Sequence, residues 1–262
     1  MTQQPIRFDD GAAYDRGMGV WSQLAGQVFL DWLAPSSGLR WIDIGCGSGA
    51  FTELLAQRYA PAEIQGIDPS EAQFAFARAR PALRKATFLR GDAMALPFET
   101  DRFDAAVMAL VLFFVPDPAK GVAEMARVVR PGGTVSSYLW IAGEGPPAPF
   151  AVELAAFGAA VARAPSADAA RMEVLRALWT DAGLEAVESR EIKVRRTFAD
   201  FDDLWSSSMG ISQVEDAVAT LAASDVQLLK ARLWARLPAD PQGRITYAAR
   251  VNAIKGRVPN SP

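Results

Sequence analysis

Residues 39–52 read LRWIDIGCGSGAFT, and this stretch decides the fold. It contains an apolar run, 41–44, in which only Asp43 is polar, as expected of a parallel strand that is covered on both faces. Glycines follow at positions 45, 47 and 49, and the lack of a Cβ lets the backbone turn sharply and present its N–H groups. Residues 50–58 then predict a helix whose first amides suit a polar or anionic group. We therefore expect a small polar ligand at the carboxyl end of this strand.

The composition of the 262 residues limits both the class of protein and its chemistry. Half of the residues are hydrophobic and 22% are charged, which allows a substantial core. The formal net charge of −3 offers no basic surface for a nucleic acid or an anionic membrane, so neither is expected as a partner. The single cysteine, Cys46, excludes an intramolecular disulfide and a cysteine metal cluster. The chain has no histidine, so any acid–base chemistry must use other groups, and no metal is expected.

Neither a secretory leader nor a membrane span is predicted. Residues 1–11 lack a basic region followed by an apolar run. The apolar segment 105–115 is shorter than the roughly 18 residues of a membrane helix and is interpreted as a buried strand. The expectation is a cytoplasmic protein, whose oligomeric state the sequence leaves open.

The chain alternates between strands and helices after the glycine loop. Further strands are predicted at 63–67, 87–90, 103–112 and 134–141, and helices at 70–80 and 117–129. This alternation is typical of parallel βαβ units in a doubly wound α/β sheet, with a ligand crevice outside the carboxyl ends of the strands. Asp68, Asp92 and the glycine loop all fall at such ends.

Two flanking regions complete the predicted organisation. Residues 14–33 have apolar positions at helical spacing, as do 150–183, with a break near Pro165, and 201–237. Strands are expected at 185–197 and 244–255. We predict a single domain, 1–262, with a cofactor-binding core at 39–141 and a helical cap or acceptor region made of 1–38 and 143–237. A separate helical lid domain is the alternative.

The glycine loop by itself fits two kinds of ligand. Gly45, Gly47 and Ala50 satisfy a relaxed dinucleotide pattern, and Asp68 follows at about the distance expected of a ribose-binding carboxylate. A loop of this kind also suits S-adenosylmethionine, so the loop alone leaves both ligands open.

Five ordered motifs resemble those of the class I S-adenosylmethionine-dependent methyltransferases. They are IDIGCGSG at 42–49, GIDPS at 66–70, GDAMALPF at 91–98, FDAAVMALVLFFVPDP at 103–118 and EMARVVRPGG at 124–133. The resemblance is to the small-molecule branch that includes the ubiquinone and menaquinone C-methyltransferases, and it is strong over 39–141. It implies a seven-stranded, mostly parallel, Rossmann-like sheet with inserted helices forming a lid. It also implies methyl transfer from S-adenosylmethionine to a small, hydrophobic metabolite by in-line displacement.

The resemblance implies cofactor-binding roles around the glycine loop. Gly45 and Gly47 would let the backbone approach the amino-acid end of the cofactor. Asp43, beneath the loop, would orient its amides or meet the ammonium group, and Tyr14 would close over the ligand. Cys46 lies within the loop and is interpreted as a small filler residue, since the chain has no histidine to activate it.

The nucleoside part of the cofactor is assigned by the same resemblance. Asp68 would accept hydrogen bonds from both ribose hydroxyls, and Asp92 would accept one from the adenine amine. The Ala93 N–H would meet a ring nitrogen, and Pro69 and Met94 would cover the two faces of the adenine. The alternative for both aspartates is a turn or cap residue, because Asp-Pro and Gly-Asp are common turn pairs.

The loop after the fourth strand departs from the pattern of many relatives, which carry one or two histidines where this chain has Phe113 and Phe114. Leu110 would line the cofactor through its backbone, and the pocket beside it is expected to be apolar. No catalytic base can be assigned, and the candidates near the fifth strand are Tyr138, Trp140 and Glu144. Large apolar side chains available to line the acceptor pocket are Phe150, Phe157, Trp179, Phe198, Phe201, Trp205, Met209 and Trp234.

Three functions therefore stay open at this stage. The first is a methyltransferase acting on a small-molecule acceptor. The second is a catalytically silent protein that binds S-adenosylmethionine, suggested by the missing histidines. The third is a dinucleotide-dependent oxidoreductase that uses the same glycine loop.

Overall fold

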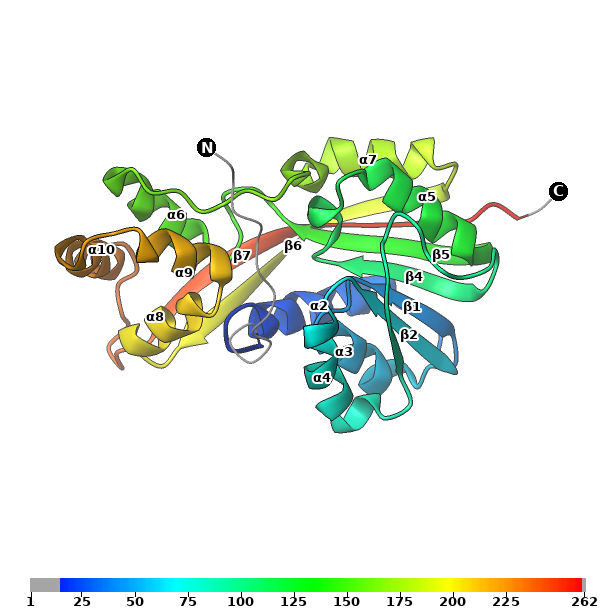
Figure 1. Cartoon of the computed structure of the whole chain (residues 1–262), viewed down its shortest axis with the longest axis horizontal. Coiled ribbons are helices and arrows are strands. Elements are labelled where there is room, and N and C mark those ends of the chain that lie inside the picture. Colours follow the sequence, from blue (N-terminus) through cyan, green and yellow to red (C-terminus); the bar gives the residue numbers. More distant parts are fainter. Residues whose placement is uncertain (1–14, 261–262) are drawn as a thin grey trace.

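The computed structural model describes residues 15–260 and contains one seven-stranded sheet (Figure 1). The strand order is β3-β2-β1-β4-β5-β7-β6, in which β1 to β5 are parallel to one another and β7 is antiparallel to both β5 and β6. The predicted mostly parallel, seven-stranded fold is confirmed. The strands are β1 Arg40–Ile44, β2 Glu63–Asp68, β3 Thr87–Arg90, β4 Phe103–Ala109, β5 Val129–Trp140, β6 Glu185–Phe198 and β7 Ile245–Arg257.

The chain order reverses between β1 and β4. From β1 the chain proceeds outward through β2 to β3, and it then returns to add β4 and β5 on the other side of β1. In the resulting register Asp43 lies between Gly66 of β2 and Val107 of β4. Doubly wound sheets bind ligands outside the carboxyl ends of their strands at such a reversal. The fold therefore directs attention to the loops that follow β1, β2, β3 and β4.

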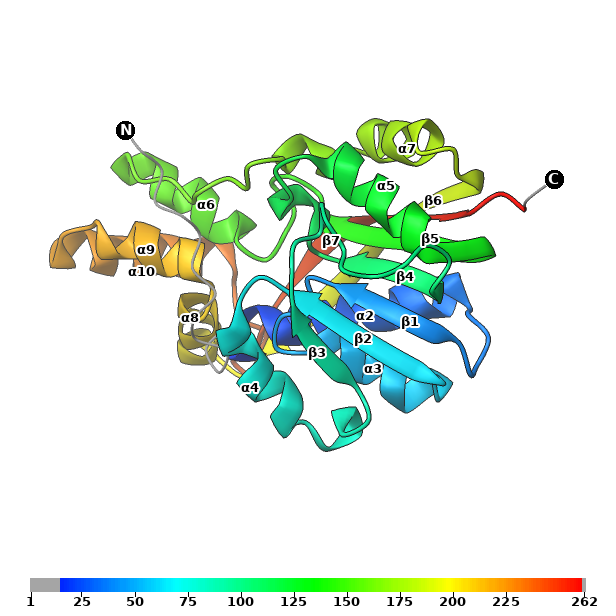
Figure 2. The same cartoon turned by 45° about the vertical axis from the view of Figure 1, so that its right-hand side comes forward.

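Helices cover both faces of the sheet (Figures 1 and 2). Helices α2 and α3 pack against one face, and α5 and α7 pack against the other. Helices α6, α8, α9 and α10 gather where β5 and β6 end and β7 begins. The helices are α2 Val20–Leu33, α3 Ala50–Tyr59, α4 Glu71–Ala79, α5 Pro118–Val128, α6 Ala148–Leu154, α7 Met172–Asp181, α8 Phe201–Met209, α9 Ser212–Ala219 and α10 Ala223–Arg236. Within residues 15–260, no helix has both the length and the apolar character needed to cross a bilayer.

One hydrophobic core connects the sheet to the helices at its end. It contains Trp21 of α2, Tyr138 of β5, Phe150 of α6 and Leu204 of α8. Trp21 contacts Trp140 edge-on, with ring centroids 6.3 Å apart. Burial of these large aromatic side chains stabilises the contact between α2 and β5.

Four predicted elements differ from the structure by more than two residues. The predicted strand 103–112 ends at Ala109, because Leu110 adopts a left-handed backbone with φ of 63°. The strand predicted at 134–141 already begins at Val129. The helical region predicted at 150–183 is divided into α6 and α7, and the predicted break near Pro165 is confirmed, but it is longer than expected and begins at Gly158, which has φ of 71°. The predicted helical region 201–237 consists of three helices, α8 to α10, separated by short turns.

Candidate functional site

The glycine loop after β1 is a tight backbone turn that faces open space. Gly45 and Gly47 have φ of 75° and 51°, conformations that side chains rarely adopt. A Cβ on Gly45 would lie 2.4 Å from a methyl carbon of Val111, whereas a Cβ on Gly47 would have no heavy atom within 4 Å. The loop is held from below, because the Gly45 N–H donates to the carbonyl of Ile67 at 2.6 Å. A ligand can therefore approach the backbone at Gly47.

Asp68, the last residue of β2, lies beside this loop. Its Oδ2 accepts a hydrogen bond from the Gly47 N–H at 3.0 Å, and its Oδ1 accepts one from the Ser70 N–H at 2.8 Å. Burial raises the pKa of Asp68, and the two backbone donors oppose that rise. A carboxylate has about four acceptor positions, so two stay available for donors of a ligand.

Asp43 is fully buried in β1 beneath the loop. The Thr52 hydroxyl donates to its Oδ2 at 2.6 Å, while its Oδ1 has no hydrogen-bond partner among the described residues. Burial raises the pKa of Asp43 to about 7, the Thr52 hydrogen bond opposes this rise, and the negative charge of Asp68 adds to it. Because an unpaired buried acceptor is costly, this carboxyl suits a cationic donor that enters above it.

A first cavity of about 350 Å³ opens at the carboxyl ends of β1, β2 and β3 and is closed by the loop after β4. Four of the predicted residues line it, namely Gly45, Pro69, Asp92 and Ala93. The Asp92 side chain is exposed and accepts a hydrogen bond from the Met94 N–H at 2.9 Å, as in an aspartate turn. Asp92 therefore has a turn role as well as a place in the cavity wall.

None of the other predicted cofactor-binding residues that the structure describes lines this first cavity. Asp43, Cys46, Gly47 and Asp68 lie beneath, in or beside the glycine loop, Met94 follows β3, and Leu110 lines a second cavity. The buried Cys46 side chain packs with Phe74 and Phe88, and burial, together with the charges of Asp43 and Asp68, raises the pKa of its thiol. Met94 packs against the core on the α5 side of the sheet. Tyr14 lies outside the described residues.

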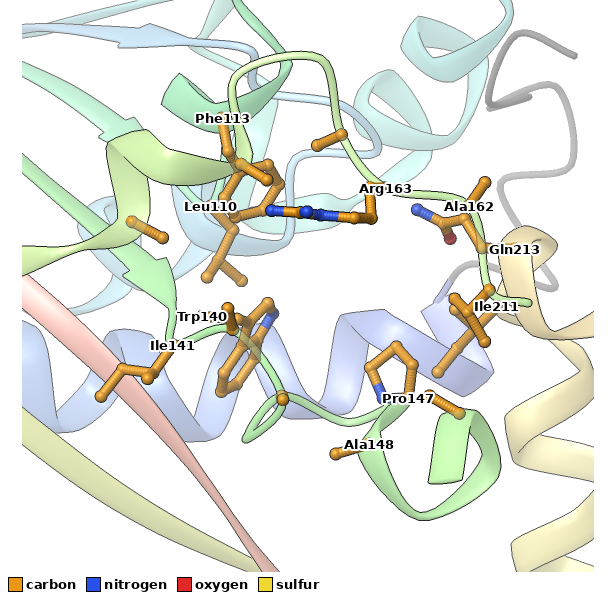
Figure 3. A pocket seen from close by; sticks show the side chains of 18 of the residues that line it. Leu110, Phe113, Trp140, Ile141, Pro147, Ala148, Ala162, Arg163, Ile211 and Gln213 are labelled. Atoms are coloured by element: carbon orange, nitrogen blue, oxygen red, sulfur yellow. The ribbon is translucent and has the colours of Figure 1, made fainter. Parts of the chain in front are cut away.

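Leu110 lies between the first cavity and a second one. Its N–H donates to the Tyr138 carbonyl at 2.8 Å, which holds the residue in its left-handed conformation. Such a conformation costs a non-glycine residue about 1 kcal/mol or more, and it is kept only where the surroundings impose it. The Leu110 side chain is buried in the wall of the second cavity (Figure 3).

The second cavity, of about 340 Å³, lies beyond the ends of β4 and β5 (Figure 3). Its wall includes Phe113, Trp140 and Ile211, and alanines and glycines from residues 142–170 leave the space open. Phe114 lines both cavities, so the two meet at the loop after β4. An apolar cavity of this size fits a small organic molecule.

Most of the expected acceptor-site residues lie elsewhere. Of the three candidates near the end of β5, Trp140 lines the second cavity, but Tyr138 is buried with its hydroxyl 3.4 Å from the Ser22 carbonyl. Glu144 forms an ion pair with Arg250. None of the eight large apolar side chains proposed for the pocket lines it. They are core or surface residues, because helical spacing does not tell which core a side chain joins.

Sequence reasoning also missed residues that do line the second cavity. Arg163, Ile211 and Gln213 come from segments far from the family motifs. The alanine-rich composition of 142–170 is the one signal in the sequence that pointed to open space there.

The structure combines a Rossmann-like sheet with a glycine loop and acidic residues at the strand ends, and an apolar cavity adjoins them. These features are typical of a cofactor-binding α/β domain. Comparison with known families agrees with this class, since residues 42–137 match the model described as "Methyltransferase domain". This match covers the region of the five motifs and confirms their resemblance to methyltransferases.

Two curated relatives are quinone-type methyltransferases by name. The chain is 41% identical over 98 residues to 2-methyl-6-phytyl-1,4-hydroquinone methyltransferase 2 of rice, a match that covers 37% of this chain and 28% of the relative. It is 40% identical over 103 residues to demethylmenaquinone methyltransferase of Roseiflexus castenholzii, covering 39% of this chain and 43% of the relative. The chain thus spans less than half the length of either relative.

A solved structure extends the comparison of the fold beyond the matched region. The YcgJ protein from Bacillus subtilis superposes with a TM-score of 0.57 at 17% identity, over 90% of this chain and 99% of that one. At this identity the agreement concerns the fold alone.

Proposed function

We propose that the protein transfers a methyl group from S-adenosylmethionine to a small, hydrophobic acceptor. The observation that carries the proposal is the pair of cavities that meet at Phe114, one at the glycine loop and the other apolar. A methyl donor in the first cavity and an acceptor in the second would then lie next to each other. The methyltransferase match over 42–137 supports this interpretation over a dinucleotide site.

The residues at the first cavity fit this cofactor. The unpaired Oδ1 of Asp43 matches an ammonium group, and the open space above Gly47 lets the backbone meet a carboxylate or ribose. The free acceptor positions of Asp68 match ribose hydroxyls, while Pro69 and Ala93 would contact the adenine. When bound, S-adenosylmethionine supplies a methyl group on a positively charged sulfur.

The contribution of the chain to the reaction is positioning and exclusion of water. Leu110 and Phe113 would hold the acceptor against the mouth of the first cavity, where the reacting atoms must come within about 3 Å. The apolar lining would keep water from the reacting centre. No catalytic base is assigned, and the acceptor must bring a reactive atom of its own.

The names of the relatives support a flat acceptor. One relative is named for a phytyl hydroquinone and the other for demethylmenaquinone, so both are named for ring compounds. Trp140 and Phe113 would provide aromatic surfaces for such a ring.

Two measurements test the proposal. Isothermal titration calorimetry should give micromolar binding of S-adenosylhomocysteine and none of NADH, and binding of NADH alone would instead support an oxidoreductase. Incubation with S-adenosylmethionine labelled in its methyl group and a metabolite extract should then label a small molecule. Tight cofactor binding with a persistent absence of transfer would contradict the enzymatic role and favour a silent binding protein.

A further inference from the structure

Arg163 is the one charged residue in the wall of the second cavity, as far as the described residues go. Figure 3 shows its side chain extended across the cavity, with the guanidinium group directed toward Leu110 and Phe113. The other lining side chains are apolar except Ser212 and Gln213. A guanidinium directed across an apolar cavity is a directional site for an anionic group.

The segment that carries Arg163 is fixed to the loop after β4. The Ser166 hydroxyl donates to the Val115 carbonyl at 2.7 Å, and the Ser166 N–H donates to the Phe113 carbonyl at 2.9 Å. Asp168 is an alternative partner of Arg163, but the two charged groups are 3.8 Å apart and 72% and 79% exposed. An exposed pair at this distance contributes little, so a ligand can replace it.

A second polar group points to the same kind of ligand. The Nε1 of Trp140 is a buried donor with no hydrogen-bond partner in the described part of the chain. Trp140 lies in the wall of the cavity below the Arg163 side chain (Figure 3). Because this nitrogen has almost no exposed surface, an acceptor oxygen bound by Arg163 would reach it only after the side chains around the indole shift, while the ring of the acceptor contacts the apolar wall.

The side chains of this cavity also restrict how a proton could leave the acceptor. The lining residues within 15–260 include no aspartate, glutamate, lysine, cysteine or tyrosine, and the whole chain lacks histidine. A neutral hydroxyl that gains a methyl group must lose its proton to some base. An oxyanion needs none, because its lone pair forms the new C–O bond, the C–S electron pair stays on sulfur and the two opposite charges cancel.

We infer that the acceptor is a flat, apolar molecule with an anionic oxygen, a carboxylate or a phenolate, and that Arg163 binds this oxygen beside the reacting centre. The inference rests on the proposed function, whose acceptor it specifies. Arg163 is a substrate-binding residue in this arrangement, and it holds the acceptor in its deprotonated form.

Calorimetry in the presence of saturating S-adenosylhomocysteine tests the carboxylate. The probes are 4-nitrobenzoate and its neutral analogue 4-nitrobenzamide, and 4-nitrobenzoate should bind about tenfold more tightly. Arg163→Gln should weaken the binding of 4-nitrobenzoate by about tenfold to a hundredfold and change the affinity for 4-nitrobenzamide by less than about twofold. Arg163→Lys should recover part of the loss, whereas Arg84→Gln, on an exposed arginine remote from the cavity, is the matched control and should change neither.

Absorbance tests the phenolate with 4-nitrophenol, whose anion is yellow. Binding to the wild-type protein should shift its ionisation to lower pH, and Arg163→Gln should abolish this shift. An effect of the Arg163 substitution in either the calorimetric or the absorbance experiment supports the inference and identifies the anion as a carboxylate or a phenolate. Equal affinities for the acid and the amide, together with no spectral shift, would overturn it.

The outcomes also separate this inference from the proposed function. Unchanged S-adenosylhomocysteine affinity in Arg163→Gln shows that the variant is folded. If S-adenosylhomocysteine binds and neither anion responds to Arg163, the inference is wrong and the proposed cofactor site stands. If S-adenosylhomocysteine does not bind, the proposed function fails, whatever the anions do.

Discussion

Replacement of Asp43 by asparagine should stabilise the protein above neutral pH, although it changes a residue under the glycine loop. Burial raises the pKa of Asp43 from 3.8 to about 7. Between about pH 4 and 7 the folded protein therefore keeps the Asp43 proton, which the unfolded chain has released. The free energy of unfolding falls over this range as the pH rises. A shift of about 3 units at about 1.4 kcal/mol each corresponds to a penalty on the order of 4 kcal/mol at pH 8. Asparagine keeps an oxygen for the Thr52 hydroxyl and has no charge to bury.

Urea unfolding without ligand at several pH values measures this effect. The free energy of unfolding of Asp43→Asn should equal that of the wild type near pH 4 and exceed it increasingly up to pH 8, with a rise of roughly 2 kcal/mol between pH 5 and 7. Asp104→Asn is a control of opposite sign. Burial opposes ionisation of Asp104, but hydrogen bonds from Arg40 and Arg130 lower its pKa to about 2, so its variant should lose stability at neutral pH. A difference between wild type and Asp43→Asn that does not change with pH would refute the reasoning.

Five further substitutions test the loop and the cavity walls. Asp68→Ala should weaken S-adenosylhomocysteine binding by about 1 to 3 kcal/mol in calorimetry, and an unchanged dissociation constant would contradict the ribose role. Gly45→Ala should lower the free energy of unfolding far more than Gly47→Ala, because only the first places a Cβ 2.4 Å from Val111, and Val111→Ala should restore part of that loss. Gly47→Ala should instead weaken cofactor binding. Ser166→Ala should lower the free energy of unfolding by about 1 kcal/mol and speed amide hydrogen exchange over residues 159–166. Unchanged exchange would show that the Ser166 hydroxyl does not hold this segment.

Local patterns in the sequence were sufficient to predict that the glycine loop and Asp68 lie together. The glycines after β1 and Asp68 at the end of β2 are neighbours because parallel strands end at the same edge of the sheet. The end of β4 was not predictable in this way. Leu110 is left-handed because its N–H meets the Tyr138 carbonyl on the adjacent strand, and no property of a leucine signals such a contact.

The second cavity, which we propose holds the acceptor, depends on packing between segments that are far apart in the sequence. Trp179 fits the predicted helical pattern, yet its Nε1 donates to the Val135 carbonyl at 3.1 Å, in the core beneath α7. Phe198 likewise stacks on Tyr247, with ring centroids 5.6 Å apart. The aromatic residues fill the cores, and small residues create the space, so a search for large apolar side chains selected the wrong set. Arg163 enters the cavity only because its segment crosses to the loop after β4.

The two cavities differ in the charges around them. The wall of the first contains Arg90 and Asp92, and Asp43 and Asp68 at the glycine loop make this side acidic in balance, whereas Arg163 is the charged residue in the wall of the second among the described residues. Under the proposed function, the acidic side attracts a donor that carries an ammonium group and a sulfonium, and the basic side attracts an anionic acceptor. Each ligand would meet like charge in the wrong cavity, and such repulsion contributes to specificity as much as attraction does. Reversal of the charge at position 163, in Arg163→Glu, should therefore exclude an anionic acceptor and leave S-adenosylhomocysteine binding intact.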